Sequence, residues 1–152
     1  MKLSENLTLK EAIKSSTAIR LGIDNEPKIE HLENLKAIAQ NVFQPIRKHF
    51  GVPIAVTSGY RSEALNSAIK GSSRSQHCKG EALDLDADVF GGVSNKQIFE
   101  YILDHIEYDQ LIWEFGSDQD PDWVHVSYKK EGNRGQILRA VRKNNKTRYE
   151  VY

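Results

Sequence analysis

Ser75-Gln76-His77-Cys78-Lys79-Gly80-Glu81-Ala82-Leu83-Asp84 is the stretch that most clearly indicates the fold of this chain, and Asp122-Trp123-Val124-His125 complements it further along. Two imidazoles and a carboxylate, those of His77, Asp84 and His125, make a ligand set suited to zinc, with a fourth position left for water. Asp122 precedes the last of these ligands by three residues, and it could take a proton from that water. The combination predicts a zinc hydrolase.

Two of these three side chains are predicted to lie on strands. Residues 82–86 alternate strictly, so their leucines face the core and Asp84 faces the other side. Residues 123–128 alternate in the same way and place His125 opposite the buried valines. A carboxylate in mid-strand is costly unless it is paired, solvated or bound to a metal. Asp84 could also belong to the solvated face of an edge strand, and the sequence spacing does not prove that the three residues converge.

Other polar residues are candidates for roles beside the ligands. Asp122 follows Pro121 at the edge of its strand, where it could be a proton acceptor or an ordinary turn aspartate. Glu114, at the end of the preceding strand, is the rival base. Arg61 could offer a fork of donors to a substrate carboxylate or carbonyl. Ser75 could orient His77 or hydrogen-bond the substrate.

The hydrophobic pattern predicts an α+β domain with a mainly antiparallel sheet flanked by helices. Residues 1–28 are expected to form an irregular lead-in with one short helix capped by Thr8, followed by a loop over 17–27. The expected helices span 29–50 (with a kink or an end at Pro45), 62–69 and 94–103. The expected strands span 53–58, 82–86, 109–115 and 123–128, followed within 134–152 by a hairpin around Asn144-Asn145.

Length and charge limit the possible functions. The 152 residues suit one domain, 1–152, and 21 basic residues balance 21 acidic ones, so no broad nucleic-acid surface is expected. The basic stretch 134–148 is the one feature that could favour such a role. The single cysteine excludes an intramolecular disulfide framework. The N-terminus is polar where a signal peptide would be apolar, and no stretch is long enough for a membrane span.

A family resemblance rests on three motifs. Ser58-Gly59-Tyr60-Arg61-Ser62, the spaced pattern from His77 to Asp84, and Trp123-x-His125 together resemble the zinc D-alanyl-D-alanine carboxypeptidase family of metallopeptidases. The most similar branch is that of small single-domain peptidases from bacteria and phages, and the resemblance runs from about Leu7 to Tyr128. It implies a fold like that of the DD-peptidases and hedgehog-like zinc domains.

The resemblance also implies roles for particular residues. His77, Asp84 and His125 match the positions that bind one zinc ion, and Asp122 matches the general base, which in the family is often glutamate. Arg61 matches an arginine thought to stabilise the substrate carbonyl or its oxyanion. The implied substrates are peptidoglycan stem peptides, cut before the terminal D-alanine or between L-alanine and D-glutamate. A monomer made in the cytoplasm would then reach the cell wall by a route other than a signal peptide.

Two alternatives remain open from the sequence. A cysteine hydrolase would use Cys78 with His125 as its base, and it would respond to thiol alkylation instead of chelators. A non-catalytic module would keep a structural zinc ion, or would hold a cell-wall peptide without cutting it. The acid at Asp122 and the arginine at Arg61 favour an enzyme over such a module.

Overall fold

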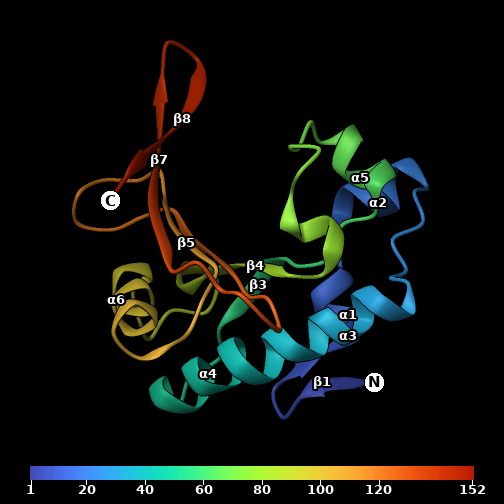
Figure 1. Cartoon of the computed structure of the whole chain (residues 1–152), viewed down its shortest axis with the longest axis horizontal. Coiled ribbons are helices and arrows are strands. Elements are labelled where there is room, and N and C mark those ends of the chain that lie inside the picture. The colour runs from blue at the N-terminus through green and yellow to red at the C-terminus, as the bar shows by residue number, and fades with distance from the viewer.

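The computed structural model describes residues 1–152, and its centre is a six-stranded sheet in the order β3-β4-β6-β5-β7-β8 (Figure 1). The strands are β3 (Ala55–Ser58), β4 (Ala82–Asp86), β5 (Gln110–Glu114), β6 (Trp123–Ser127), β7 (Gln136–Lys143) and β8 (Lys146–Val151). Neighbouring strands are antiparallel except β5 and β7, which are parallel. The mixed α+β class and the mainly antiparallel sheet are confirmed.

The helices flank this sheet. They are α1 (Leu9–Ile13), α2 (Ser16–Leu21), α3 (Ile29–Ile38), α4 (Gln44–Phe50), α5 (Glu63–Ala68) and α6 (Asn95–His105), with a π-helical turn η1 (Ala39–Phe43) and two 3₁₀ turns, η2 (Gln76–Lys79) and η3 (Ala87–Val89). Figure 1 shows α3, α4 and α6 in the lower half of the view, while α5 and the β7–β8 hairpin rise at the top. No helix is both long and apolar enough to span a bilayer.

The two faces of the sheet have different environments. Leu83, Leu85, Leu111, Val124 and Val126 are fully buried, and they belong to one hydrophobic core with residues of α3, η1, α4 and α6. Because side chains alternate along a strand, the intervening residues of β4, β5 and β6 face the opposite side. That opposite side carries the polar residues of the site described below.

The N-terminal segment is more ordered than the sequence pattern suggested. β1 (Lys2–Ser4) pairs with β2 (Leu7–Thr8), and the predicted capping box of Thr8 with Glu11 begins α1. The expected loop over 17–27 is wrong in its first part, because α2 occupies Ser16–Leu21. The Ser15 side chain caps that helix and Gly22, in the left-handed conformation, ends it, so local signals stabilise it despite its short length.

The predicted long helix over 29–50 is present, with an internal irregularity. It comprises α3, the π-helical turn η1 and α4, which follow one another without a break. Pro45 has no amide hydrogen to donate within the helix, and the widened turn directly before it accommodates this defect. The helix therefore continues past the proline to Phe50, where Gly51 in the left-handed conformation ends it.

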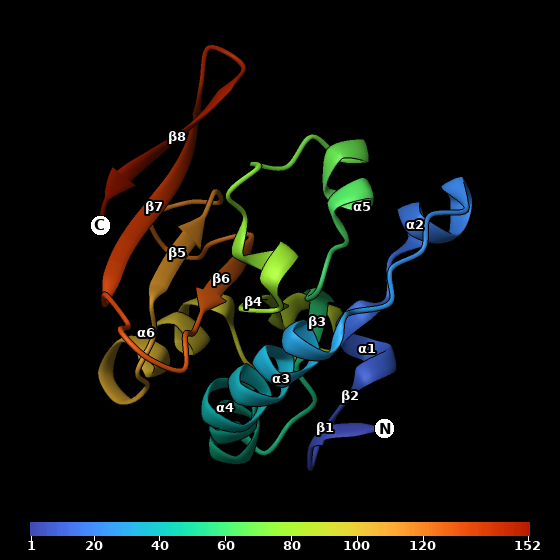
Figure 2. The ribbon, with the colours of Figure 1, turned by 45° about the vertical axis from the view of Figure 1, so that its right-hand side comes forward.

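The predicted C-terminal hairpin is confirmed. Asn144 and Asn145 join β7 to β8 with φ values of 52° and 62°. Two consecutive positive φ angles are typical of a type I′ turn, which asparagine tolerates better than most residues. Figure 2 shows the hairpin at the upper left of the view, above α6, and α5 at the upper right.

Candidate metal centre

His77 lies in η2, a short turn that packs closely on α3. The hydroxyl of Ser75 accepts a hydrogen bond from the His77 amide, and Gly80 ends the turn with a φ of 73°. A β-carbon at Gly80 would lie 2.4 Å from the carbonyl oxygen of His31, so only glycine allows this approach. The sequence thus places the imidazole on a rigid support instead of a loose loop.

The His77 ring has one satisfied nitrogen and one unsatisfied one. Its Nδ1 lies 2.7 Å from the carbonyl oxygen of Gly59 and donates to it, which leaves a lone pair on Nε2. Nε2 is buried, has no hydrogen-bond partner and lies 3.3 Å from Oδ1 of Asp84. Two electron-pair donors that face each other in a buried place require a cation or a proton between them.

Asp84 and His125 complete the group from adjacent strands. They are directly opposite each other in the β4–β6 register, and His125 Nδ1 lies 3.0 Å from Asp84 Oδ1. One potential ligand atom from each of His77, Asp84 and His125 lies within 4.8 Å of the others. The three predicted ligands are therefore brought together by the fold.

The protonation states of His77 and Asp84 suit metal binding. Burial lowers the pKa of His77, which keeps the imidazole neutral. Burial alone would raise the pKa of Asp84, but His77 and His125 hold that pKa well below its ordinary range, so the carboxylate is ionised. A neutral imidazole and an ionised carboxylate are the forms that coordinate zinc, and the carbonyl bond to His77 Nδ1 fixes the required tautomer. The residues present fit a zinc ion.

Arg61 reaches the same site from the segment after β3. Its Nε donates to the Ser58 hydroxyl at 3.1 Å, and its Nη1 donates to the Asn66 side-chain oxygen at 3.1 Å. Its Nη2 lies 3.8 Å from Oδ2 of Asp84. Asn66, which the sequence did not single out, is itself held by the Ser72 carbonyl at 2.8 Å. The guanidinium is therefore fixed in orientation beside the carboxylate ligand.

A cleft of about 790 Å³ contains these groups. His77, Asp84, His125 and Arg61 line it, as does Ser75. Cys78 does not line this cleft, and burial raises the pKa of its thiol. A less ionised thiol outside the cleft argues against the cysteine-hydrolase alternative.

Glu114 lies inside the cleft, whereas Asp122 does not. The Glu114 side chain lines the cleft and the residue is only 7% exposed. Burial raises the pKa of Glu114 to about 7. The nearby His125 and Arg61 oppose this shift, and the charge of Asp84 adds to it. Glu114, the rival base predicted from the sequence, therefore lines the same cleft as the three ligands.

Asp122 is exposed, and its backbone is hydrogen-bonded to neighbouring segments. Its amide donates to the Glu114 carbonyl at 2.9 Å, and its own carbonyl accepts from the Asn95 side chain at 3.0 Å. Glu114 pairs with Trp123 in the β5–β6 register, and both residues line the cleft. Asp122 lies one residue before β6 and does not line the cleft, and its role as the base stays a prediction.

The fold and this three-ligand group define a metallopeptidase-type domain. A family model described as Peptidase M15 matches residues 5–127, and the chain belongs to that family, whose members are zinc enzymes. The family suggested by the sequence motifs is confirmed. No curated protein matches the chain.

Proposed function

We propose that this chain is a zinc-dependent peptidase that hydrolyses peptidoglycan stem peptides, either before the terminal D-alanine or between L-alanine and D-glutamate. The observation that carries the proposal is the unpartnered Nε2 of His77, which faces the Asp84 carboxylate at 3.3 Å in a member of the M15 family. The stem-peptide substrate is inferred from the motifs around Arg61, His77 and His125. The site of action that follows is the cell wall.

His77, Asp84 and His125 would hold one zinc ion per chain. The ion supplies Lewis-acid chemistry, because it polarises a carbonyl and makes a water molecule acidic near neutral pH. The protein's part is to supply donors in fixed positions: Gly59 orients His77, and Arg61 lies beside the second oxygen of Asp84.

We propose Glu114, in place of Asp122, as the general base. A base must reach the reacting water and have a pKa near the working pH. Glu114 lines the cleft and has a pKa raised to about 7, whereas Asp122 is exposed and lies outside the cleft. In this account the Glu114 carboxylate takes a proton from water as the water attacks the scissile carbonyl, and then passes the proton to the leaving amine.

Arg61 is proposed to stabilise the negative charge that develops on the carbonyl oxygen. Preorganised donors aimed at such a charge give a large part of the rate enhancement in many hydrolases. Ser58 and Asn66 already hold two of the guanidinium nitrogens of Arg61, so little reorganisation is needed when the substrate binds. Ser75 lines the same cleft and could contact the substrate near His77.

Mass spectrometry of purified peptidoglycan fragments tests this function. The zinc-loaded protein should yield hydrolysis products, and a chelator-treated sample should yield none. The product masses distinguish loss of a terminal D-alanine from a cut after L-alanine. Intact fragments after incubation with protein that demonstrably holds zinc would overturn the proposal and favour a non-catalytic cell-wall-peptide binding module.

A further inference from the structure

The β7–β8 hairpin lies beyond the matched part of the chain, yet it forms one wall of the cleft. The family match ends at residue 127, and β7 begins at Gln136. Leu138, Arg142, Thr147 and Tyr149 of the hairpin line the cleft. Arg142 is directly opposite Thr147 in the β7–β8 register, so both side chains face the same side. The wall is thus one continuous face of the hairpin, next to the proposed catalytic groups.

Tyr149 lies in the same cross-strand row as Glu114. Glu114 is paired with Ala140, and Ala140 is paired with Tyr149. Adjacent strands lie about 4.8 Å apart, so the backbones of Glu114 and Tyr149 are separated by about 10 Å. Both side chains line the cleft, with the small Ala140 between them in the row. A substrate that contacts Glu114 can therefore contact the Tyr149 ring and hydroxyl as well.

The Tyr149 hydroxyl is available as a hydrogen-bond donor. The residue is 58% exposed, so its side chain is open to a ligand from the cleft side. Burial of its inner part, followed by the charges of Glu114 and Asp84, raises the pKa of Tyr149, while Arg61 opposes the shift. The phenol therefore keeps its proton at neutral pH and can donate to an oxygen of the substrate.

Arg142 supplies a positive charge on the same wall. Its guanidinium lies over the Phe115 ring, 5.3 Å from the ring centre, and it has no acidic partner within salt-bridge distance. Two other hairpin cations are neutralised, Arg139 by Asp118 at 2.7 Å and Lys143 by Glu150 at 2.8 Å. Arg142 therefore remains free for an anionic ligand.

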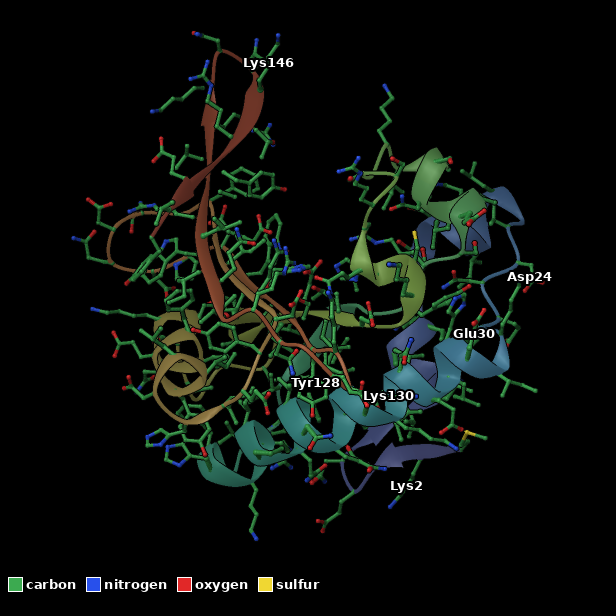
Figure 3. All side chains as sticks on the ribbon, in the orientation of Figure 1. Lys2, Asp24, Glu30, Tyr128, Lys130 and Lys146 are labelled. Carbon is green, nitrogen blue, oxygen red and sulfur yellow. The ribbon has the colours of Figure 1, made fainter.

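The opposite wall of the cleft has the same sign of charge. Lys70 and Arg74, from the loop after α5, line the cleft across from the hairpin. Five lysine and arginine residues line it, of which Arg134 is neutralised by Asp109, so four remain against the two carboxylates of Asp84 and Glu114. An excess of positive charge in a cleft attracts anionic ligands. Figure 3 shows the hairpin standing apart from the α5 region, with Lys146 at its tip pointing away from both.

We propose that this hairpin face recognises a carboxylate of the peptide substrate, with Arg142 as the charged contact and Tyr149 as the hydroxyl donor. The carboxylate belongs either to an acidic residue within the peptide or to its C-terminus, which present the same chemistry. The identity of the peptide rests on the proposed function. The preference for a carboxylate does not require turnover.

The test compares stem peptides that contain L-alanine, D-glutamate and terminal D-alanines. One peptide has all carboxyl groups free, one has the glutamate carboxyl amidated, and one has the C-terminal carboxyl amidated. The zinc-loaded wild type should bind the free-acid peptide about tenfold more tightly than one of the two amides. The amide that weakens binding identifies the source of the carboxylate.

Arg142→Gln should reduce this preference to less than about twofold, and Arg148→Gln should leave it unchanged. Arg148 is the matched control because it is also an exposed arginine of the hairpin, but it is paired with Val141 and does not line the cleft. Tyr149→Phe keeps the ring, loses the hydroxyl and should weaken binding of the free-acid peptide about threefold. Equal binding of the three peptides by the wild type, or equal effects of the two arginine variants, would overturn the proposal.

Two readouts separate this inference from the proposed function. If the zinc-loaded protein cleaves the peptides, the comparison is made with kcat/KM; otherwise it is made with Kd. Absence of cleavage therefore counts against the peptidase function, while the carboxylate preference and its loss in Arg142→Gln still decide the role of the hairpin.

Discussion

Glu114 lines the cleft and Asp122 is an exposed residue outside it, so variants of the two carboxyl groups can be compared directly. Glu114→Gln keeps the size of the side chain and removes the proposed proton acceptor, so we expect kcat/KM to fall about 10²- to 10⁴-fold while zinc content is unchanged. Asp122→Asn alters an exposed residue outside the cleft and should stay within about twofold of wild type. The reverse order, measured by peptide hydrolysis with the zinc content of each sample, would return the role to Asp122.

The raised pKa of Glu114 predicts a specific pH profile. Burial raises the pKa to about 7, and the base acts only when it is deprotonated, so kcat/KM should fall as the pH decreases below about 7. A bound cation favours the ionised carboxylate and would move the midpoint lower. In the residual activity of Glu114→Gln this acidic limb should be absent. An identical limb in wild type and variant would assign it to a different group.

At the scale of residues, the sequence predicted which three side chains the fold groups together, whereas the choice of base stays a prediction. His77, Asp84 and His125 follow from motif spacing and from strand alternation, which the sheet register obeys. An ideal ladder would put Asp122 on the side opposite His125, but a residue at the edge of a strand need not follow that alternation, so the sequence left Asp122 as first choice and Glu114 as second. Asn66 carried no local signal because its bond to Arg61 depends on how the segment between β3 and α5 folds. Tyr149 carried none because it reaches the row of Glu114 only through the β5–β7 pairing.

At the scale of elements, η2 holds His77 in place through the close contact of Gly80 with α3. Gly80→Ala would place a β-carbon 2.4 Å from the His31 carbonyl oxygen and would also strain a φ of 73°. Gly132→Ala is the control, since its φ is 77° but its β-carbon would meet nothing within 4 Å. Chemical denaturation should show Gly80→Ala to be about 2 kcal/mol less stable than Gly132→Ala.

Zinc affinity should fall in Gly80→Ala as well, because a shift of η2 moves the His77 ring away from Asp84. Gly132→Ala should bind zinc like the wild type. Equal stabilities and equal zinc affinities of the two variants would show that the contact between η2 and α3 does not position the ligand.

Elements with strong periodicity were predictable, and those set by local capping were less so. The apolar stripe over residues 29–50 predicted α3 to α4, and Asn144-Asn145 predicted the hairpin turn. The short α2 was missed because its six residues have little periodicity, although Ser15 and Gly22 supply its caps. The π-helical turn before Pro45 could not be predicted, since tertiary packing decides how a helix accommodates a proline.

At the scale of the whole molecule, Asp109 ties the hairpin to the rest of the domain. It is fully buried, and its carboxylate accepts from Arg134 Nε at 3.0 Å and from Arg134 Nη2 at 2.7 Å. Its carbonyl accepts from the Gln136 amide at 2.9 Å, where β7 begins. Asp109→Asn should therefore lower the free energy of unfolding by about 2 kcal/mol, measured by denaturation at neutral pH.

The Asp109 pair also predicts how stability depends on pH. Burial alone would raise the pKa of Asp109, but the hydrogen bonds and charge of Arg134, together with Lys129, hold the pKa below its ordinary value. A lowered pKa in the folded state adds stability above the unfolded-state value of about 4, and this stability is lost as the pH falls through the folded-state pKa. Acid titrations of wild type and Asp109→Asn should converge at low pH; parallel curves would contradict the role of this ion pair.

The two faces of the sheet have different roles, one in stability and the other in the proposed chemistry. One face buries the leucines and valines of β4, β5 and β6 against the helices, and the other face carries Asp84, His125 and Glu114 in the cleft. Sequence alternation indicated this division for β4 and β6. It could not indicate that the hairpin, reached through a parallel β5–β7 pairing, would form a wall of the same cleft.

Zinc content and peptide hydrolysis, followed in the same samples during chelation and stepwise return of zinc, test the central claim most directly. We predict one zinc ion per wild-type chain, hydrolysis that rises in proportion to bound zinc, and loss of both in Asp84→Ala, with Asp122→Asn as the control that keeps both. A wild-type chain that binds no zinc, or hydrolysis that persists after the metal has been removed, would contradict the account.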